Sequence, residues 1–266
     1  MCSLTVGDVR HHSTYRSRFL GTHHDVLVYL PPGYDDTEDR RYPVLYLHDG
    51  QNVFDGETAF IRGQEWEVDE SAERLIRARA MQPVIIVAVH NAGDARIDEY
   101  TPSPDPGLSR GGNAINYGRF LVEELKPFID REYRTWRAAR NTGLGGSSLG
   151  GLVSLFLWNE YPHVFGRLAI MSPSLWWDRR VILRTLEQSN HPQRPKIWLD
   201  VGTCESDSPE VSVRDARLLK ELLLRKGWRE GHDLRYLEAQ GDGHNELAWA
   251  RRVPPMLRFL FPLPTR

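Results

Sequence analysis

The segment "NTGLGGSSLGGLVSLFLWNEYP", residues 141–162, decides the fold, because it joins a short strand to a buried helix through two glycine-flanked serines. "NTGL" predicts the strand, and "LGGLVSLFLW" is apolar nearly all round, which is typical of a helix buried inside a protein. A serine nucleophile on a sharp strand-to-helix turn lies in a Gly-x-Ser-x-Gly frame, because larger side chains at the flanking positions would collide with their neighbours.

Only one of the two serines fits this frame. Ser148 has Gly146 two residues before it and Gly150 two residues after it, whereas Ser147 is followed at that spacing by Leu149. We therefore expect Ser148 to be the nucleophile. The alternatives are a plain Gly-Ser turn and a phosphate-binding loop, but a phosphate loop would require a lysine before the Ser or Thr, and none is present.

Apolar runs and helical patterns alternate along the rest of the chain. The predicted strands are 26–30, 44–47, 84–89, 142–144, 168–171, 196–201 and 234–237. The predicted helices are 68–79, 117–129, one that starts just after Ser148, 213–226 and 246–260. This alternation predicts one α/β domain over residues 1–266, with a mostly parallel central sheet and helices on both faces. Two long loops, 49–65 and 91–116, follow strands, so we expect them at the carboxyl edge of the sheet, where such folds bind ligands.

Composition excludes several classes of partner. The formal net charge is −2, so there is no basic excess to attract nucleic acid or an anionic membrane. No apolar run approaches the ~20 residues that span a bilayer. The N-terminal residues lack the apolar stretch of a signal peptide, and two cysteines cannot form a disulfide framework. We therefore expect a cytoplasmic protein.

A histidine suited to act as a general base follows the last predicted strand. His244 lies in the glycine-rich loop "GDGHNE", ahead of the final helix. A general base must lie near the nucleophile, on a loop that leaves one of its ring nitrogens free for the serine. The chain has 10 histidines, and we expect most to be incidental. His48 and His90 lie at strand ends near the expected site, where a structural role is the simpler interpretation.

The acid that would orient this histidine has more than one candidate. "KIWLDVGTCESD" places Asp200, Glu205 and Asp207 at or beyond the end of a strand. Asp200 lies too far back in the strand to reach the loop of His244, whereas Glu205 and Asp207 are both placed to orient an imidazole. The residues alone do not decide whether Glu205 or Asp207 is the acid.

The oxyanion of an acyl transfer needs two backbone N–H donors. The residue after the nucleophile, Leu149, supplies one, and the loop after an early strand supplies the other, for which we choose Gln51. Four aromatic side chains near the expected site are candidates for a substrate-binding wall, with ordinary packing as the alternative: Trp66, Tyr100, Trp176 and Trp177.

Six segments in order resemble the esterase D and enterochelin-esterase-like family of α/β-hydrolases: "LYLHDGQNVFD", "RIDEYTP", "GGSSLGGL", "SPSLWWD", "LDVGTCESD" and "GDGHNELAW". The resemblance covers residues 26–261. It implies an α/β-hydrolase fold, with Ser148 as the nucleophile, His244 as the base, Glu205 as the acid and Gln51 as an oxyanion donor. Glu205 is thereby favoured over Asp207. The resemblance implies no metal and no cofactor.

The expected function is that of a serine carboxylic-ester hydrolase, acting through an acyl-enzyme on a small-molecule ester that is soluble and carries aromatic groups. The segment after "SPSLWWD" is short, so we expect no large lid and an open cleft roofed by the two long loops. Two alternatives remain: an acyltransferase with the same triad, and a catalytically silent binding protein with the same fold.

Overall fold

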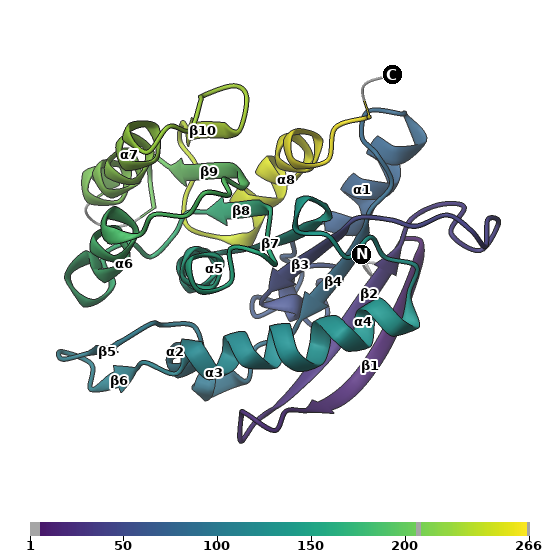
Figure 1. The fold of residues 1–266 in the computed structure, drawn as a ribbon, viewed down its shortest axis with the longest axis horizontal. Helices are drawn as coiled ribbons and strands as arrows, with labels where there is room; N and C mark the ends of the chain where they lie inside the picture. Colours follow the sequence, from purple (N-terminus) through teal and green to yellow (C-terminus); the bar gives the residue numbers. More distant parts are fainter. Residues whose placement is uncertain (1–5, 206–208, 265–266) are drawn as a thin grey trace.

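A computed structural model describes residues 6–205 and 209–264, and its centre is one eight-stranded sheet (Figure 1). The strand order is β1-β2-β4-β3-β7-β8-β9-β10. From β4 to β10 in this order neighbouring strands are parallel, while β2 is antiparallel to both β1 and β4. The bounds are β1 Asp8–Arg16, β2 His23–Leu30, β3 Val44–His48, β4 Ile85–Val89, β7 Thr142–Ser147, β8 Arg167–Met171, β9 Lys196–Gly202 and β10 Leu234–Ala239.

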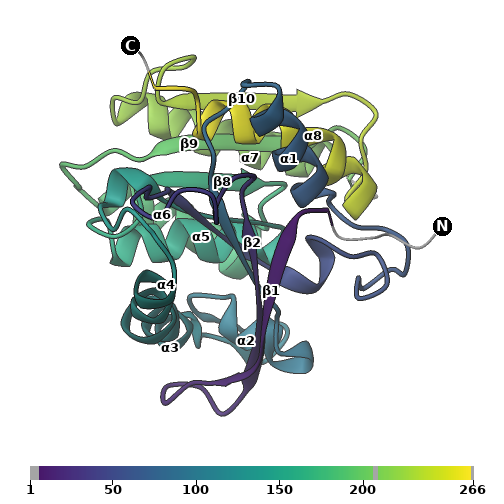
Figure 2. The ribbon, with the colours of Figure 1, turned by 90° about the vertical axis from the view of Figure 1, so that its right-hand side faces the viewer.

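Helices cover both faces of this sheet (Figures 1 and 2). On one face, α1 (Val68–Arg77) and α8 (Glu246–Leu260) lie side by side. The other face carries α3 (Ala114–Arg119), a π-helical turn η3 (Phe120–Leu125), α4 (Lys126–Glu132), α5 (Leu149–Glu160), α6 (Trp177–Gln188) and α7 (Pro209–Arg225). The predicted mostly parallel sheet with helices on both faces is confirmed.

The central strands are buried because apolar side chains project from both of their faces. Every residue of β3 and β4 is buried, as is every residue of β7. Two large hydrophobic clusters result, one on each side of the sheet. Leu152 of α5 and Leu219 of α7 belong to the first, and Val68 of α1 and Met256 of α8 to the second. An all-apolar strand buried on both faces is the pattern expected of a parallel sheet.

Seven of the eight strands in the main sheet coincide with predicted strands. The exception, β1, was not predicted, and neither was α6. The predicted helix 117–129 is the continuous stretch α3, η3 and α4. The strands of this one sheet come from along the chain between Asp8 and Ala239.

The two long loops contain short elements of their own. The first holds the 3₁₀ turn η1 (Gly50–Asn52). The second holds η2 (Gly93–Ala95), α2 (Arg96–Glu99) and a two-stranded ribbon of β5 (Pro104–Asp105) and β6 (Arg110–Gly111). A further 3₁₀ turn, η4 (Ala139–Asn141), precedes β7. Within the described residues, every helix is too short or too polar to cross a membrane.

Candidate active site

The turn between β7 and α5 has the backbone of a nucleophile elbow. Ser148 lies between the last residue of β7 and the first of α5, with φ 57° and ψ −121°. A Cβ added at Gly146 would lie 3.0 Å from the backbone of Gly150, which leaves no room for a larger side chain. A positive φ is unfavourable for any residue except glycine, so packing on both sides must hold Ser148 in this conformation.

The two serines lie differently, as the glycine frame predicts. Ser147 is the last residue of β7, pairs with Met171 of β8 and is buried. Ser148 is half-buried, and its Oγ lies 3.1 Å from the Oγ of Ser174. Both residues border the same cavity.

Two further elements bring an imidazole and a carboxylate together beside this elbow. Nδ1 of His244, from the loop between β10 and α8, lies 3.2 Å from Oε2 of Glu205, which follows β9. The Glu205 side chain is 3% exposed and that of His244 is 33% exposed. The other carboxylate oxygen of Glu205 accepts from the backbone N–H of Gly202 at 2.5 Å and from the hydroxyl of Ser172. The carboxylate is therefore held from one side and meets the imidazole on the other.

The other acid candidates have different positions. Asp200 is fully buried in β9 and accepts from Arg252 Nη1 at 2.5 Å and from Trp198 Nε1 at 2.6 Å. Burial raises the pKa of Asp200 to about 6, although the Arg252 guanidinium opposes that rise. Asp207 lies outside the described residues.

The two expected oxyanion donors come from the starts of helical turns. Leu149 is the first residue of α5, so its N–H has no acceptor within the helix. Gln51 precedes the first hydrogen bonds of η1, which run from Asn52 N to Asp49 O and from Val53 N to Gly50 O. A Cβ at Gly50 would lie 2.6–2.7 Å from the backbone of β4, so glycine alone permits this close approach.

A cavity of about 290 Å³ opens at the carboxyl edge of the sheet. It contains both Ser148 and His244, and both long loops contribute to its wall. Phe60 and Ile61 of the first loop are 83% and 41% exposed and form an apolar rim. The other lining residues are Asp49, Gln51, Asn52, Asn91, Arg96, Ser147, Glu246 and Trp249.

Several of these lining residues were not singled out in the sequence. Arg96 donates to both carboxylate oxygens of Asp49, at 2.6 and 2.8 Å, and Asn91 donates to Asp49 as well. Burial favours a higher pKa for Asp49, but the Arg96 guanidinium and the Asn91 amide hold the pKa below its usual value. Burial raises the pKa of Glu246. The signal in the sequence was "HDG", which directly follows the predicted strand 44–47, and "RIDE", which lies in the long loop after the predicted strand 84–89.

The four predicted wall aromatics lie elsewhere. Trp66, Tyr100 and Trp177 are fully buried, and none of the four borders the cavity. Trp66 packs behind Trp249, with ring centroids 5.7 Å apart, and Trp176 is 53% exposed. Three of the four, Trp66, Tyr100 and Trp177, are used to fill the core, as is usual for large aromatics beside strand ends, and the exposed Trp176 does not border the cavity either. Phe60 and Trp249 supply the aromatic surface in their place.

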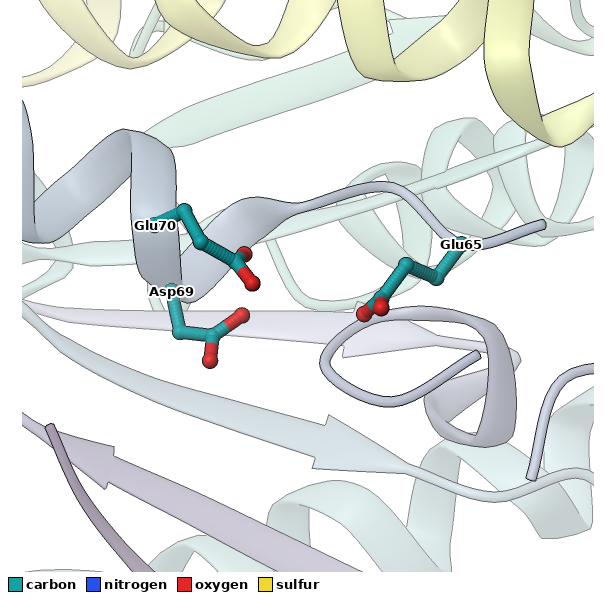
Figure 3. A group of neighbouring side chains, drawn as sticks. All are labelled: Glu65, Asp69 and Glu70. Atoms are coloured by element: carbon teal, nitrogen blue, oxygen red, sulfur yellow. The ribbon is translucent and has the colours of Figure 1, made fainter. Parts of the chain in front are cut away.

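Among the described residues, one group of acidic side chains has the spacing of a metal site. Ligand oxygens of Glu65, Asp69 and Glu70 lie within 4.8 Å of one another. Figure 3 shows Asp69 and Glu70 facing each other in the first turn of α1, with Glu65 reaching toward them from the preceding loop. Burial raises the pKa of Asp69 to about 8, and a hydrogen bond with Glu70 adds to the effect. None of the three residues borders the cavity of Ser148.

Comparison with known proteins gives a family match over most of the chain. The model of the family described as "Putative esterase" matches residues 17–260. The ferri-bacillibactin esterase BesA of Bacillus subtilis is 28% identical, over 76% of this chain and 73% of its own. An endo-1,4-beta-xylanase/feruloyl esterase of Xylanibacter ruminicola is 25% identical, over 93% of this chain and 31% of its own.

Solved structures agree on the fold. The BES protein from Bacillus cereus superposes with a TM-score of 0.76 at 24% identity, covering 98% of this chain and 97% of its own. The enterobactin esterase FES from Shigella flexneri has a TM-score of 0.76 at 19% identity, over 97% of this chain and 60% of its own. The predicted α/β-hydrolase fold is confirmed.

Proposed function

Because the chain belongs to the Putative esterase family, we propose that it is a serine carboxylic-ester hydrolase whose triad is Ser148, His244 and Glu205. The observation that carries the proposal is that the elbow serine and the His244–Glu205 pair open on one cavity. The strained backbone of Ser148 adds support, because such strain persists where the surrounding structure fixes it for function.

The mechanism begins with an acyl transfer to the serine. The Ser148 hydroxyl attacks the ester carbonyl carbon while His244 accepts its proton. The backbone N–H groups of Gln51 and Leu149 stabilise the oxyanion. The bond to the leaving alcohol then breaks, and His244 donates the proton to the alcohol oxygen. Glu205 holds the imidazole through Nδ1 and stabilises its cationic form.

Water completes the cycle. It attacks the acyl-enzyme and gives its proton to His244, which returns it to Ser148 as the acid is released. In this structure the Ser148 hydroxyl is hydrogen-bonded to the hydroxyl of Ser174. In the substrate complex we expect the Ser148 hydroxyl to hydrogen-bond His244 instead, because catalytic hydrogen bonds often form or tighten only when substrate is bound.

The substrate that we propose is a soluble ester with an aromatic group. Phe60 at the rim and Trp249 in the wall offer aromatic surface, and the relatives named above include a ferri-bacillibactin esterase and a feruloyl esterase. Rates on acetyl, butyryl, feruloyl and triscatecholate esters would rank the classes. Transfer of the acyl group to an added alcohol or sugar acceptor would reveal an acyltransferase.

A cytoplasmic location and a single domain over residues 1–266 stay predictions.

The proposal is tested by exchanging the two serines. Ser148→Ala should abolish hydrolysis of a 4-nitrophenyl ester, with a loss on the order of a millionfold in kcat, the size seen when a triad nucleophile is removed. Ser147→Ala is the matched control and should keep most of the activity, because its side chain is buried at the end of β7. An active Ser148→Ala beside a dead Ser147→Ala would refute the assignment of the elbow.

A further inference from the structure

The residue after β8 is a buried serine with an unusual backbone. Ser172 is 2% exposed and has φ 42°, a conformation that costs a non-glycine residue about 1–3 kcal/mol. Its backbone N–H donates to the carbonyl of Asp200 at 2.9 Å, which anchors it to β9. Ser172 lies two residues before Ser174, the neighbour of the nucleophile.

The hydroxyl of Ser172 has three hydrogen-bond partners, and their chemistry fixes its direction. Trp249 Nε1 lies 2.9 Å from Ser172 Oγ, and Arg252 Nη1 lies 3.2 Å from it. Indole and guanidinium nitrogens can only donate, so both lone pairs of the hydroxyl accept. Its single proton is left for the third partner, Oε1 of Glu205.

A buried cation stands behind this hydroxyl. The Arg252 side chain is 3% exposed, donates to Asp200 Oδ1 at 2.5 Å, and has Nη2 3.8 Å from Glu205 Oε1. Two buried carboxylates therefore share one guanidinium. Buried charges are stable only where they are paired and hydrogen-bonded, and the Ser172 hydroxyl links the guanidinium to Glu205.

We propose that Ser172 is a positioning residue for the catalytic acid, an inference that rests on the proposed role of Glu205. Ser172 and the backbone N–H of Gly202 occupy Oε1, so the carboxylate cannot rotate, and Oε2 faces Nδ1 of His244. The hydroxyl acts through Glu205 on the orientation of the imidazole. It touches neither the substrate nor the reacting atoms.

The experiment is a double-mutant cycle on esterase turnover. Ser172→Ala should lower kcat by about 10- to 100-fold, by analogy with the loss seen when a group that orients a metal ligand is removed. KM should change little, because Ser172 itself does not line the cavity. Ser172→Ala added to Glu205→Gln should cost nothing further, since residues that act as one unit are not additive.

Two more variants separate positioning from folding. Ser172→Gly also lacks the hydroxyl but relieves the positive φ, so it should fold at least as well as Ser172→Ala and lose as much kcat. Ser71→Ala removes a buried serine hydroxyl in α1, away from the cavity, and should leave kcat unchanged. Thermal unfolding of each variant reports its folding directly.

The outcomes keep the two proposals apart. If wild type shows no esterase activity, or Glu205→Gln matches wild type, the proposed function or its acid is wrong. If Glu205→Gln loses activity while folded Ser172→Gly keeps it, the role of Ser172 is wrong and the proposed function stands. Losses that multiply in the double variant would also overturn it, because Ser172 would then act independently of Glu205.

Discussion

At the scale of single residues, three residues with positive φ angles follow neighbouring strands at the carboxyl edge of the sheet. Asp49, Ser148 and Ser172 have φ angles of 55°, 57° and 42°. Each directly follows a strand, and the three strands, β3, β7 and β8, are neighbours in the sheet. Strain of this kind persists only where the surroundings fix it, and it gathers at functional sites. The three residues support one functional centre at this edge.

The identity of the acid is the first residue-scale prediction. Glu205→Gln should lower kcat by a factor on the order of 10⁴, the cost of removing a triad acid, because an amide cannot stabilise the imidazolium. The loss should be smaller than for Ser148→Ala, because the acid does not carry the proton. Asp207→Asn is the matched control and should stay close to wild type. Turnover of a 4-nitrophenyl ester measures both.

Other results would change the assignment of the acid in defined ways. Equal and mild losses would indicate a Ser-His dyad or an acid elsewhere, with Asp200 the next candidate. A large loss from Asp207→Asn alone would move the role to Asp207 and leave the rest of the mechanism in place. The buried hydrogen bonds that Asp200 accepts from Arg252 and Trp198 argue against Asp200 as the acid.

At the scale of elements, the elbow depends on close contact between β7 and β8. A Cβ added at Gly145 would lie 2.4 Å from the Ala169 side chain and 2.7 Å from its carbonyl oxygen. Both atoms belong to the neighbouring strand, so neither can move without disturbing the sheet. Gly145→Ala should therefore lower the free energy of unfolding by at least about 1–3 kcal/mol.

The measurement for this prediction is urea denaturation against a matched glycine. Gly21 is exposed, and a Cβ there meets nothing within 4 Å. Gly21→Ala should leave stability unchanged or raise it slightly. Equal stability of the two variants would show that β7 and β8 pack less tightly than the register of Gly145 with Ala169 implies.

The elements that the sequence predicted are those whose burial leaves a pattern. β3 and β4 are apolar on both faces, and the polar surroundings of such runs mark their ends. β1 lacks that mark, because it is a largely exposed edge strand with the polar sequence "DVRHHSTYR". The start of α6 was hidden because residues 178–180 have positive φ angles, which no helical pattern encodes.

The candidate site could be proposed from the sequence where chemistry requires a fixed motif. The glycine frame leads to Ser148, and the loop order leads to His244 and to a short set of acids. The neighbours of these residues were not predictable, because their roles depend on which loops meet. Arg252 reaches Asp200 from 52 residues away, and Trp249 reaches Ser172 from 77. Trp66 was expected in the cavity wall but is buried in the core, whereas Phe60, which was not singled out, is exposed at the cavity rim.

At the scale of the whole molecule, one histidine is buried beside the turn between β7 and α5. His48 ends β3 and is 1% exposed, and its Nδ1 lies 2.9 Å from the Tyr117 hydroxyl. Burial lowers the pKa of His48 to about 3, with the nearby Arg96 guanidinium adding to the effect and the Asp49 carboxylate opposing it. The folded protein therefore keeps this imidazole neutral where an unfolded chain, with a pKa near ~6.5, would protonate it.

The consequence is a loss of stability in acid that depends on His48. The lowered pKa contributes stability that is fully present above pH ~6.5 and is lost as pH falls toward 3, at about 1.4 kcal/mol per pH unit. Between pH 7 and pH 4.5 we expect His48 to account for a decrease of about 3 kcal/mol in the free energy of unfolding. His48→Gln should reduce the slope of the free energy of unfolding against pH by an amount equal to nearly one bound proton, whatever its effect at neutral pH.

Urea denaturation at intervals across this pH range measures the slope, with the exposed His163→Gln as the control that should leave the slope unchanged. An unaltered slope in His48→Gln would mean that this histidine is protonated in the folded state, and that the core beside the elbow is open to water.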